Sequence, residues 1–196
     1  MTYFYFGLDL GQRRDPTAIA VVERTDPVLN RFDPQVYFSL RQADTEPRFA
    51  VRHLERIPLG TTYPDVVARV RDLTRRPEVA GRLTLVVDGT GVGRAVVDLL
   101  RQADLDCELV EVSITAGAKA HLTKGCWYLP KADLTGALQV MVERGRVSFG
   151  PDVPETARLI DELMALRMRP GGGWMDGRPD DLAVALCLAC WRAGRD

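Results

Sequence analysis

The stretch that decides the fold is Tyr3–Gly11 (YFYFGLDLG), near the start of the sequence. Its aromatic first half favours a β-strand, which we expect over residues 4–10. One acidic residue, Asp9, stands between two leucines near the end of this strand. A carboxylate at the end of a hydrophobic strand lies where side chains leave the core and meet a cleft. Asp9 is therefore the first candidate functional residue.

Two further acidic positions lie at the ends of apolar elements. Asp88 closes the run Leu83–Asp88 (LTLVVD), and Asp180 and Asp181 open an apolar helix over 182–191. A single small fold would bring these ends together with that of the first strand. A cluster of carboxylates offers hard oxygen ligands, which suit Mg²⁺ or Mn²⁺ better than zinc.

The order of the elements predicts one mixed sheet. Strands are expected over 4–10, 17–23, 35–40, 83–88 and 107–112, with a short extended piece over 147–149. Helices are expected over 64–75, 94–102, 132–144, 154–168 and from about Pro179 onward, and a loop over 115–125. The first three strands are linked by turn residues and read as an antiparallel meander. The strand–helix–strand unit that follows implies parallel pairing. The fold class is thus α/β, with three antiparallel strands followed by parallel strands and helices on both faces.

Length and composition define the broad class of protein. At 196 residues, with no composition shift, we expect a single domain over 1–196. The net charge of −1 excludes a uniformly basic nucleic-acid protein, although arginines are bunched. No apolar run approaches the roughly 20 residues needed to span a bilayer. The first residues lack the features of a secretory signal, so we expect a cytoplasmic protein without a membrane partner.

Cysteine and histidine do not provide an alternative chemistry. Cys187 and Cys190 form a CxxC pair inside an apolar helix, and no second pair completes a zinc site. We interpret them as buried structural thiols. His53 and His121 stand alone, which argues against nucleophilic catalysis by serine or cysteine.

Three segments resemble the nuclease domain of phage terminase large subunits, within the ribonuclease H-like superfamily. The opening hairpin is represented by residues 7–11 followed by 15–22, the second acidic motif by 86–93, and the closing motif by 180–186. A weaker likeness covers 129–134. The likeness spans nearly the whole sequence in order. Two departures are that no ATPase phosphate-binding loop occurs, and that Pro179 precedes the closing acidic pair where the family often has a histidine.

The resemblance implies a DNA endonuclease that uses two Mg²⁺ or Mn²⁺ ions. Asp9 would bridge the ions, Asp88 would bind one, and Asp181 or Asp180 the other, with Asp9, Asp88 and Asp181 as the catalytic set. The expected phosphate-backbone contacts are Arg13, Arg14, Lys119, Lys124 and Lys131. The implied partners are double-stranded DNA and a separate packaging ATPase or other phage packaging proteins, in the host cytoplasm if the gene is carried by a phage or prophage.

Four other interpretations remain open at the level of sequence. A dinucleotide site is disfavoured because Arg94 replaces the third glycine of the expected pattern after Gly89 and Gly91. Sugar kinases and actin-like ATPases share the core but need two such domains. A Holliday-junction resolvase would use the same carboxylates. A catalytically inactive DNA-binding or assembly module would keep the fold without cleaving DNA.

Overall fold

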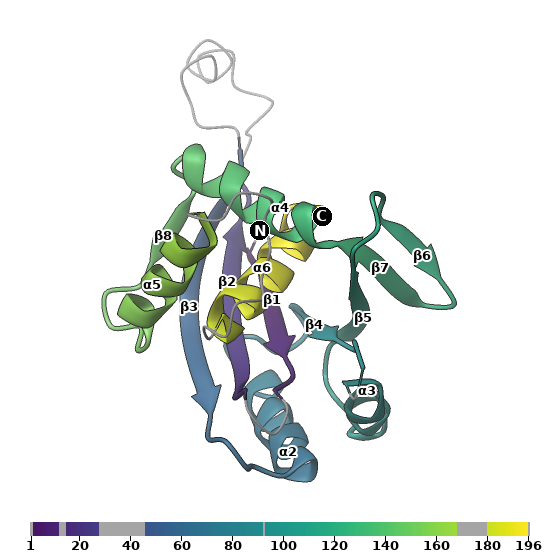
Figure 1. Cartoon of the computed structure of the whole chain (residues 1–196). Coiled ribbons are helices and arrows are strands. Elements are labelled where there is room, and N and C mark those ends of the chain that lie inside the picture. Colours follow the sequence, from purple (N-terminus) through teal and green to yellow (C-terminus); the bar gives the residue numbers. More distant parts are fainter. Residues whose placement is uncertain (1, 12–14, 28–45, 92, 168–179, 196) are drawn as a thin grey trace, which may run out of the picture.

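The computed structural model describes residues 2–11, 15–27, 46–91, 93–167 and 180–195 (Figure 1). The strands are β1 (Thr2–Asp9), β2 (Thr17–Thr25), β3 (Arg48–Ile57), β4 (Leu83–Asp88), β5 (Glu108–Thr115), β6 (His121–Thr123), β7 (Cys126–Pro130) and β8 (Val147–Phe149). The helices are α2 (Tyr63–Thr74), α3 (Gly93–Gln102), α4 (Lys131–Glu143), α5 (Thr156–Arg167) and α6 (Asp181–Ala193).

All eight described strands form one mixed sheet in the order β6-β7-β5-β4-β1-β2-β3-β8. Strands β1, β2 and β3 are antiparallel neighbours, and the pairing of β1 with β2 is the one that the sequence predicts. Strands β4, β5 and β7 continue the sheet on the other side of β1 by parallel pairing. The chain therefore runs through an antiparallel meander first and then through crossover connections.

Helices cover both faces of the sheet (Figure 1). Helices α4, α5 and α6 pack on one face, and the buried residues between them form the larger core cluster. Helices α2 and α3 cover the other face, where β-branched and leucine side chains from both layers meet. Each inner strand is apolar on both sides, which is the pattern of a sheet covered by helices on both faces.

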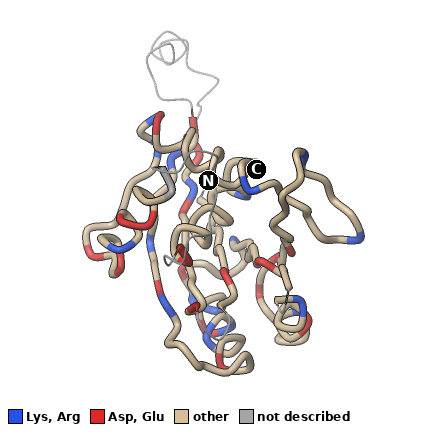
Figure 2. The backbone as a smooth tube through the Cα atoms, in the orientation of Figure 1, with Lys and Arg blue, Asp and Glu red and all other residues tan. Residues whose placement is uncertain are grey.

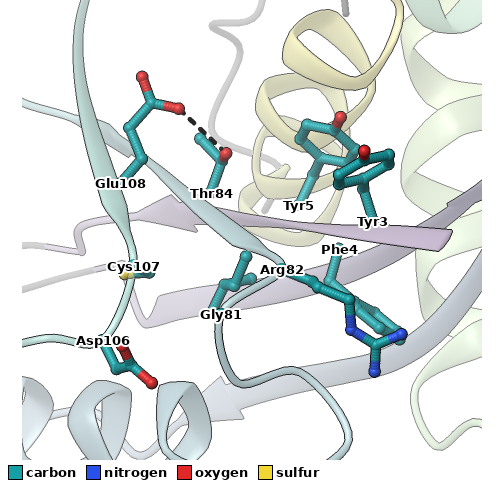
Figure 3. Close-up of a pocket in the computed structure, with 10 residues that line it drawn as sticks. Tyr3, Phe4, Tyr5, Gly81, Arg82, Thr84, Asp106, Cys107 and Glu108 are labelled. Atoms are coloured by element: carbon teal, nitrogen blue, oxygen red, sulfur yellow. Dashed lines mark hydrogen bonds between the residues drawn. The ribbon is translucent and has the colours of Figure 1, made fainter. Parts of the chain in front are cut away.

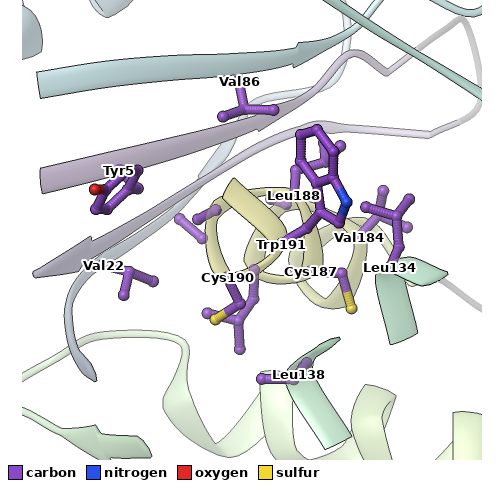
Figure 4. Packing of buried hydrophobic residues seen from close by; sticks show 14 of the residues in the cluster. Tyr5, Val22, Val86, Leu134, Leu138, Val184, Cys187, Leu188, Cys190 and Trp191 are labelled. Carbon is purple, nitrogen blue, oxygen red and sulfur yellow. The ribbon is translucent and has the colours of Figure 1, made fainter. Parts of the chain in front are cut away.

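Helix α6 is the most deeply buried helix, and nearly all its residues are inaccessible to solvent. Figure 4 shows its side chains packed between the sheet and α4, with Trp191 beside Leu188 and the two cysteines. Burial raises the pKa of the Cys190 thiol to about 12, so it stays protonated at neutral pH. Both cysteines of the CxxC pair are buried and free, as predicted for structural thiols.

Two parts of the predicted arrangement need correction. The third antiparallel strand is β3, which the sequence analysis did not identify, while the strand predicted over 35–40 lies outside the described residues. The loop predicted over 115–125 is wrong at its second half, because β6 lies there and pairs with β7 to form a hairpin. Within the described part of the chain, no helix combines the length and apolarity needed to cross a bilayer.

Candidate metal centre

The strand register places Asp9 and Asp88 next to each other. Strands β1 and β4 are parallel neighbours, and Leu8 pairs with Val87, so the next residue of each strand is a carboxylate. Both strands end there, at the same edge of the sheet. The two side chains emerge at the carboxyl ends of adjacent parallel strands, which is where open α/β sheets bind ligands.

Gly7 brings the start of α6 to the same place. A Cβ atom at Gly7 would lie 1.8 Å from the backbone oxygen of Ala185, so the helix passes directly over a strand position without a side chain. Asp181 lies one helical turn before Ala185, and Asp9 lies two residues after Gly7 on the same face of the strand. The close contact between helix and strand therefore carries Asp181 toward Asp9.

Asp9 is the centre of a cluster of like charges. Burial and four nearby carboxylates all raise the pKa of Asp9 well above its ordinary value, with burial as the largest cause. In order of effect, the neighbours are Asp88, Asp181, Asp180 and Asp15. Asp15, which the sequence analysis did not name as a site residue, is exposed just before β2. Asp88, Asp181 and Asp180 thus all lie near enough to Asp9 to raise its pKa.

Asp88 is held in place by the turn that follows it. The Thr90 backbone N–H donates to Asp88 Oδ1 at 2.9 Å, and the Thr90 hydroxyl donates to the same oxygen. Thr90 Oγ1 in turn accepts from the Ile114 N–H of β5 at 3.0 Å. Burial raises the pKa of Asp88, and these hydrogen bonds partly offset the rise. The turn therefore fixes the orientation of a carboxylate at the end of β4.

Asp181 is engaged by two residues that the sequence analysis missed. Arg56 Nη2 from β3 lies 2.9 Å from Asp181 Oδ2, and the same guanidinium group pairs with Glu162 of α5. Glu162 Oε2 also accepts from the Ala183 N–H at 3.0 Å, in the first turn of α6. Asp180 occupies the N-cap position but makes no side-chain capping bond, and Glu162 caps this end of the helix through the Ala183 N–H instead. Burial raises the pKa of Glu162 to about 7.

These residues fit a hard divalent cation. The donors that converge are all carboxylate oxygens, and the clustered charge on Asp9 would be relieved by a cation. Asp181 Oδ2 is buried and, apart from its ion pair with Arg56, accepts no hydrogen bond from the residues that the structure describes. Among the described residues, no three acidic, histidine or cysteine side chains form a ready-made ligand group. In proteins generally, Mg²⁺ commonly takes one or two carboxylates and fills its other positions with water and phosphate oxygens.

The residues predicted to bind DNA are separated in the structure. Arg13 and Arg14 lie outside the described residues. Lys131 begins α4 immediately after Pro130, which pairs with Thr115 at the carboxyl end of β5. Lys119 precedes β6 at the open end of the hairpin, and Lys124 lies in its turn, at the other end.

Figure 2 shows basic positions at both ends of this hairpin, which extends away from the rest of the sheet. Lys119 and Lys124 are exposed. Lys119 and Lys131 lie toward the edge that carries the carboxylates, whereas Lys124 is the most distant of the three along the hairpin.

An open pocket of about 480 Å³ lies at the opposite edge of the sheet (Figure 3). It is lined by residues at the amino ends of β1, β4 and β5, including Tyr3, Arg82 and Glu108. Thr84 donates a hydrogen bond to Glu108 along its wall. Because Asp9 and Asp88 close the other ends of these strands, the pocket is separate from the acidic cluster.

Comparison with solved structures identifies the fold. The large terminase nuclease from thermophilic phage G20c superposes with a TM-score of 0.58 and 22% identity, over 96% of this chain and 81% of that one. The fold is that of a terminase nuclease domain. The Mn-soaked human cytomegalovirus terminase nuclease domain gives a TM-score of 0.55 at 14% identity, covering 96% and 83% of the two chains.

The g2p large terminase nuclease domain of bacteriophage SPP1, solved with bound Mn, gives a TM-score of 0.54 at 13% identity, over 97% of this chain and 86% of that one. The phage G20c domain is also known with bound zinc. No protein-family model and no curated protein sequence matches the chain. The ribonuclease H-like α/β fold predicted from the sequence is confirmed, and at these identities the terminase likeness is one of fold.

Proposed function

We propose that this domain is a divalent-metal-dependent endonuclease that hydrolyses phosphodiester bonds in double-stranded DNA, in the manner of a terminase. The observation that carries the proposal is the convergence of Asp88, Asp181 and Asp180 on Asp9 at one edge of a terminase-type fold. An all-carboxylate site of this kind has few uses other than holding hard cations.

Two ions, Mg²⁺ or Mn²⁺, would be held by Asp9, Asp88 and Asp181, with Asp180 assisting Asp181. Bound ions of this kind activate the attacking water and neutralise charge on the leaving oxygen of a phosphodiester. Asp88 contributes orientation, since Thr90 fixes one of its oxygens. Asp181 lies in the first turn of α6, where the helix dipole favours a carboxylate by about 0.3–1 kcal/mol.

The proposed DNA contacts are Lys119, Lys124 and Lys131, together with Arg13 and Arg14, which follow the first acidic strand in the sequence. Such contacts position a duplex through its phosphates without reading its sequence. A packaging ATPase and other packaging proteins of a phage are the proposed partners, and the host cytoplasm is the proposed location.

One observation favours a second candidate, a module of the same fold that binds DNA without cutting it. The ion pair between Arg56 and Asp181 occupies a carboxylate that the nuclease needs. Cleavage assays separate the two candidates, because the binding module remains inactive with every carboxylate present.

The test incubates supercoiled plasmid with the protein in Mg²⁺, Mn²⁺ or EDTA, beside Asp9→Asn and Asp88→Asn. We expect metal-dependent nicking or linearisation that both variants lose. A parallel arm offers a four-way junction and a linear duplex, since preference for the junction would indicate a resolvase. A folded wild-type protein that cuts no substrate in either metal would contradict the nuclease proposal.

A further inference from the structure

A three-residue ionic network joins the acidic cluster to the interior of the protein. Arg56 comes from β3, Glu162 from α5 and Asp181 from α6. Their side chains are 14%, 5% and 5% exposed, so all three are largely removed from water. At this burial an ion pair is not an incidental surface contact, because desolvation of its charges must be compensated by their arrangement.

The sheet register places Arg56 level with the predicted ligands. Asp9 pairs with Ala18 across β1 and β2, and Ala18 pairs with Arg56 across β2 and β3. These side chains lie on the same face of the sheet, the face covered by α6. Ala18 is fully buried and small, so it leaves room above itself for the longer Arg56 side chain.

Glu162 connects the guanidinium group to the helix that carries Asp181. One of its oxygens pairs with Arg56 and the other accepts from the Ala183 N–H. A purely structural cap would need only the second of these bonds. The bond to Arg56 holds the guanidinium group between two carboxylates, that of Glu162 in the core and that of Asp181 at the proposed metal site.

Two buried polar atoms of the network have no hydrogen-bond partner among the described residues. Within the described part of the chain, Arg56 Nε is buried without a hydrogen-bond partner, and Asp181 Oδ2 accepts no hydrogen bond despite its 2.9 Å contact with Arg56 Nη2. Buried polar atoms are normally satisfied, so two such atoms in one network call for an explanation. A carboxylate oxygen reserved for another ligand provides one for Asp181.

We propose that Arg56 is the built-in countercharge of the acidic cluster, which neutralises Asp181 in the metal-free protein and competes with a divalent ion for that carboxylate. Glu162 acts as a positioning residue that shares the guanidinium group with Asp181 and so weakens the hold of Arg56 on that carboxylate. The inference rests on the proposed metal-dependent function.

The proposal predicts opposite effects for the two partners. Arg56→Gln removes a positive charge beside the ion, so Mn²⁺ affinity should rise on the order of tenfold. Glu162→Gln keeps an oxygen for the Ala183 N–H but removes the negative charge that restrains Arg56, so Mn²⁺ affinity should fall. Arg56→Lys retains the charge and should stay near the wild-type affinity.

The experiment is a calorimetric titration of the 196-residue chain with Mn²⁺ in the absence of DNA, at pH 8, where Glu162 with its pKa of about 7 is ionised. Asp9→Asn identifies the part of the signal that belongs to the site. Arg52→Gln is the matched control, because Arg52 lies on the same strand but is half-exposed and pairs with Glu23. It should leave the affinity unchanged. In EDTA, Arg56→Gln should melt several degrees below wild type. Adding Mn²⁺ should raise the melting temperature of Arg56→Gln by more than it raises that of wild type.

Weaker Mn²⁺ binding by folded Arg56→Gln would show that Arg56 only supports the architecture, and would overturn the inference while leaving the proposed function intact. If Arg56→Gln does not fold, unchanged or tighter binding by Glu162→Gln overturns the inference equally. Wild-type protein that binds no more Mn²⁺ than Asp9→Asn would instead reject the proposed function. In that case the pairing of Arg56 with Asp181 in the metal-free protein is tested by thermal melting of Arg56→Lys, Asp181→Asn and the double variant. If the two single substitutions lower the melting temperature additively in the double variant, the pairing is contradicted.

Discussion

Replacing Gly7 with alanine should separate the helix from the strand on which the site depends. The added Cβ would lie 1.8 Å from the Ala185 backbone oxygen and 2.9 Å from the Ala189 backbone nitrogen. Real Cβ atoms essentially never approach another atom closer than 3.0 Å, and backbone atoms cannot rotate away. Helix α6 must therefore move by more than 1 Å, and it carries Asp181 with it.

The magnitude follows from the packing around α6, whose residues are almost all buried. Forcing extra atoms into a close-packed core costs about 1–3 kcal/mol and sometimes more, and this contact lies at the upper end of that range. We expect a loss of about 3 kcal/mol, which lowers the melting temperature of a domain of this size by roughly 6–12 °C. A displacement of about 1 Å at a catalytic group can reduce turnover by about 10²-fold, so DNA cleavage should fall further than stability alone explains.

The assay pairs thermal melting with plasmid cleavage below the melting transition. Gly136→Ala is the matched control, because a Cβ at this position of α4 meets nothing within 4 Å. It should stabilise the protein by about 0.5–1 kcal/mol, the usual gain from replacing a helical glycine. A Gly7→Ala protein with the melting temperature and the DNA cleavage rate of wild type would refute the tight approach of α6 to β1.

Three further predictions concern charge, orientation and DNA contact. Without metal, the free energy of unfolding should decrease by about 1–2 kcal/mol from pH 5 to 7.5, because the pKa of Glu162 is about 7 in the folded protein and its usual value is 4.5. This magnitude allows for screening by solvent. Urea titrations in EDTA measure the change. Thr90→Val removes the hydroxyl that orients Asp88 and should lower Mn²⁺ affinity by about tenfold in calorimetry. Lys119→Gln and Lys124→Gln should each reduce the slope of log DNA affinity against log salt concentration by about 1, which corresponds to the loss of one phosphate contact. Fluorescence anisotropy measures this slope.

Each of these predictions has a contradicting result. The sign of the pH effect follows from linkage: a carboxyl group whose folded pKa is raised stabilises the protein fully below its unfolded pKa and loses that contribution as the pH rises through the folded pKa. Stability that rises between pH 5 and 7.5 would contradict it. Thr61→Val, which loses only a hydroxyl bond to Pro58, is the control for Thr90→Val, and equal Mn²⁺ affinities would exclude an orienting role. An unchanged salt slope would remove a lysine from the proposed DNA contacts.

The sequence predicted the inner part of the sheet because its signals are local. Strands β1 and β4 are apolar runs that end in a carboxylate, and β4 is followed at once by a glycine-rich turn and a helix. The single acidic residue that ends each run was therefore recognisable as a candidate metal ligand. The register that brings Asp9 beside Asp88 follows from parallel pairing of the two strands, which the sequence predicted only in outline.

Strand β3 was missed for a physical reason. Its sequence RFAVRHLERI carries charges between its apolar residues, and an irregularity in its pairing with β2 interrupts the alternation. Strand β6 has only three residues, all exposed, so no apolar pattern marks it. Local pattern is a weak guide where a strand is short or lies toward the edge of a sheet.

Arg56 and Glu162 lie beyond sequence reasoning of this kind. They are 106 residues apart, and neither belongs to a motif, so only the fold shows that they meet. Gly7 did carry a signal, since a glycine inside a strand marks a close approach by another backbone. That signal would have pointed to α6, and through it to the position of Asp181.

The most direct measurement is an anomalous difference map from crystals of the protein soaked in Mn²⁺. The account predicts density beside Asp9, bounded by Asp88 on one side and Asp181 on the other, and its disappearance in Asp9→Asn crystals. Mn²⁺ density that is absent from this edge of the sheet in wild-type crystals, or that persists unchanged in the variant, would contradict the assignment of these carboxylates as a metal centre.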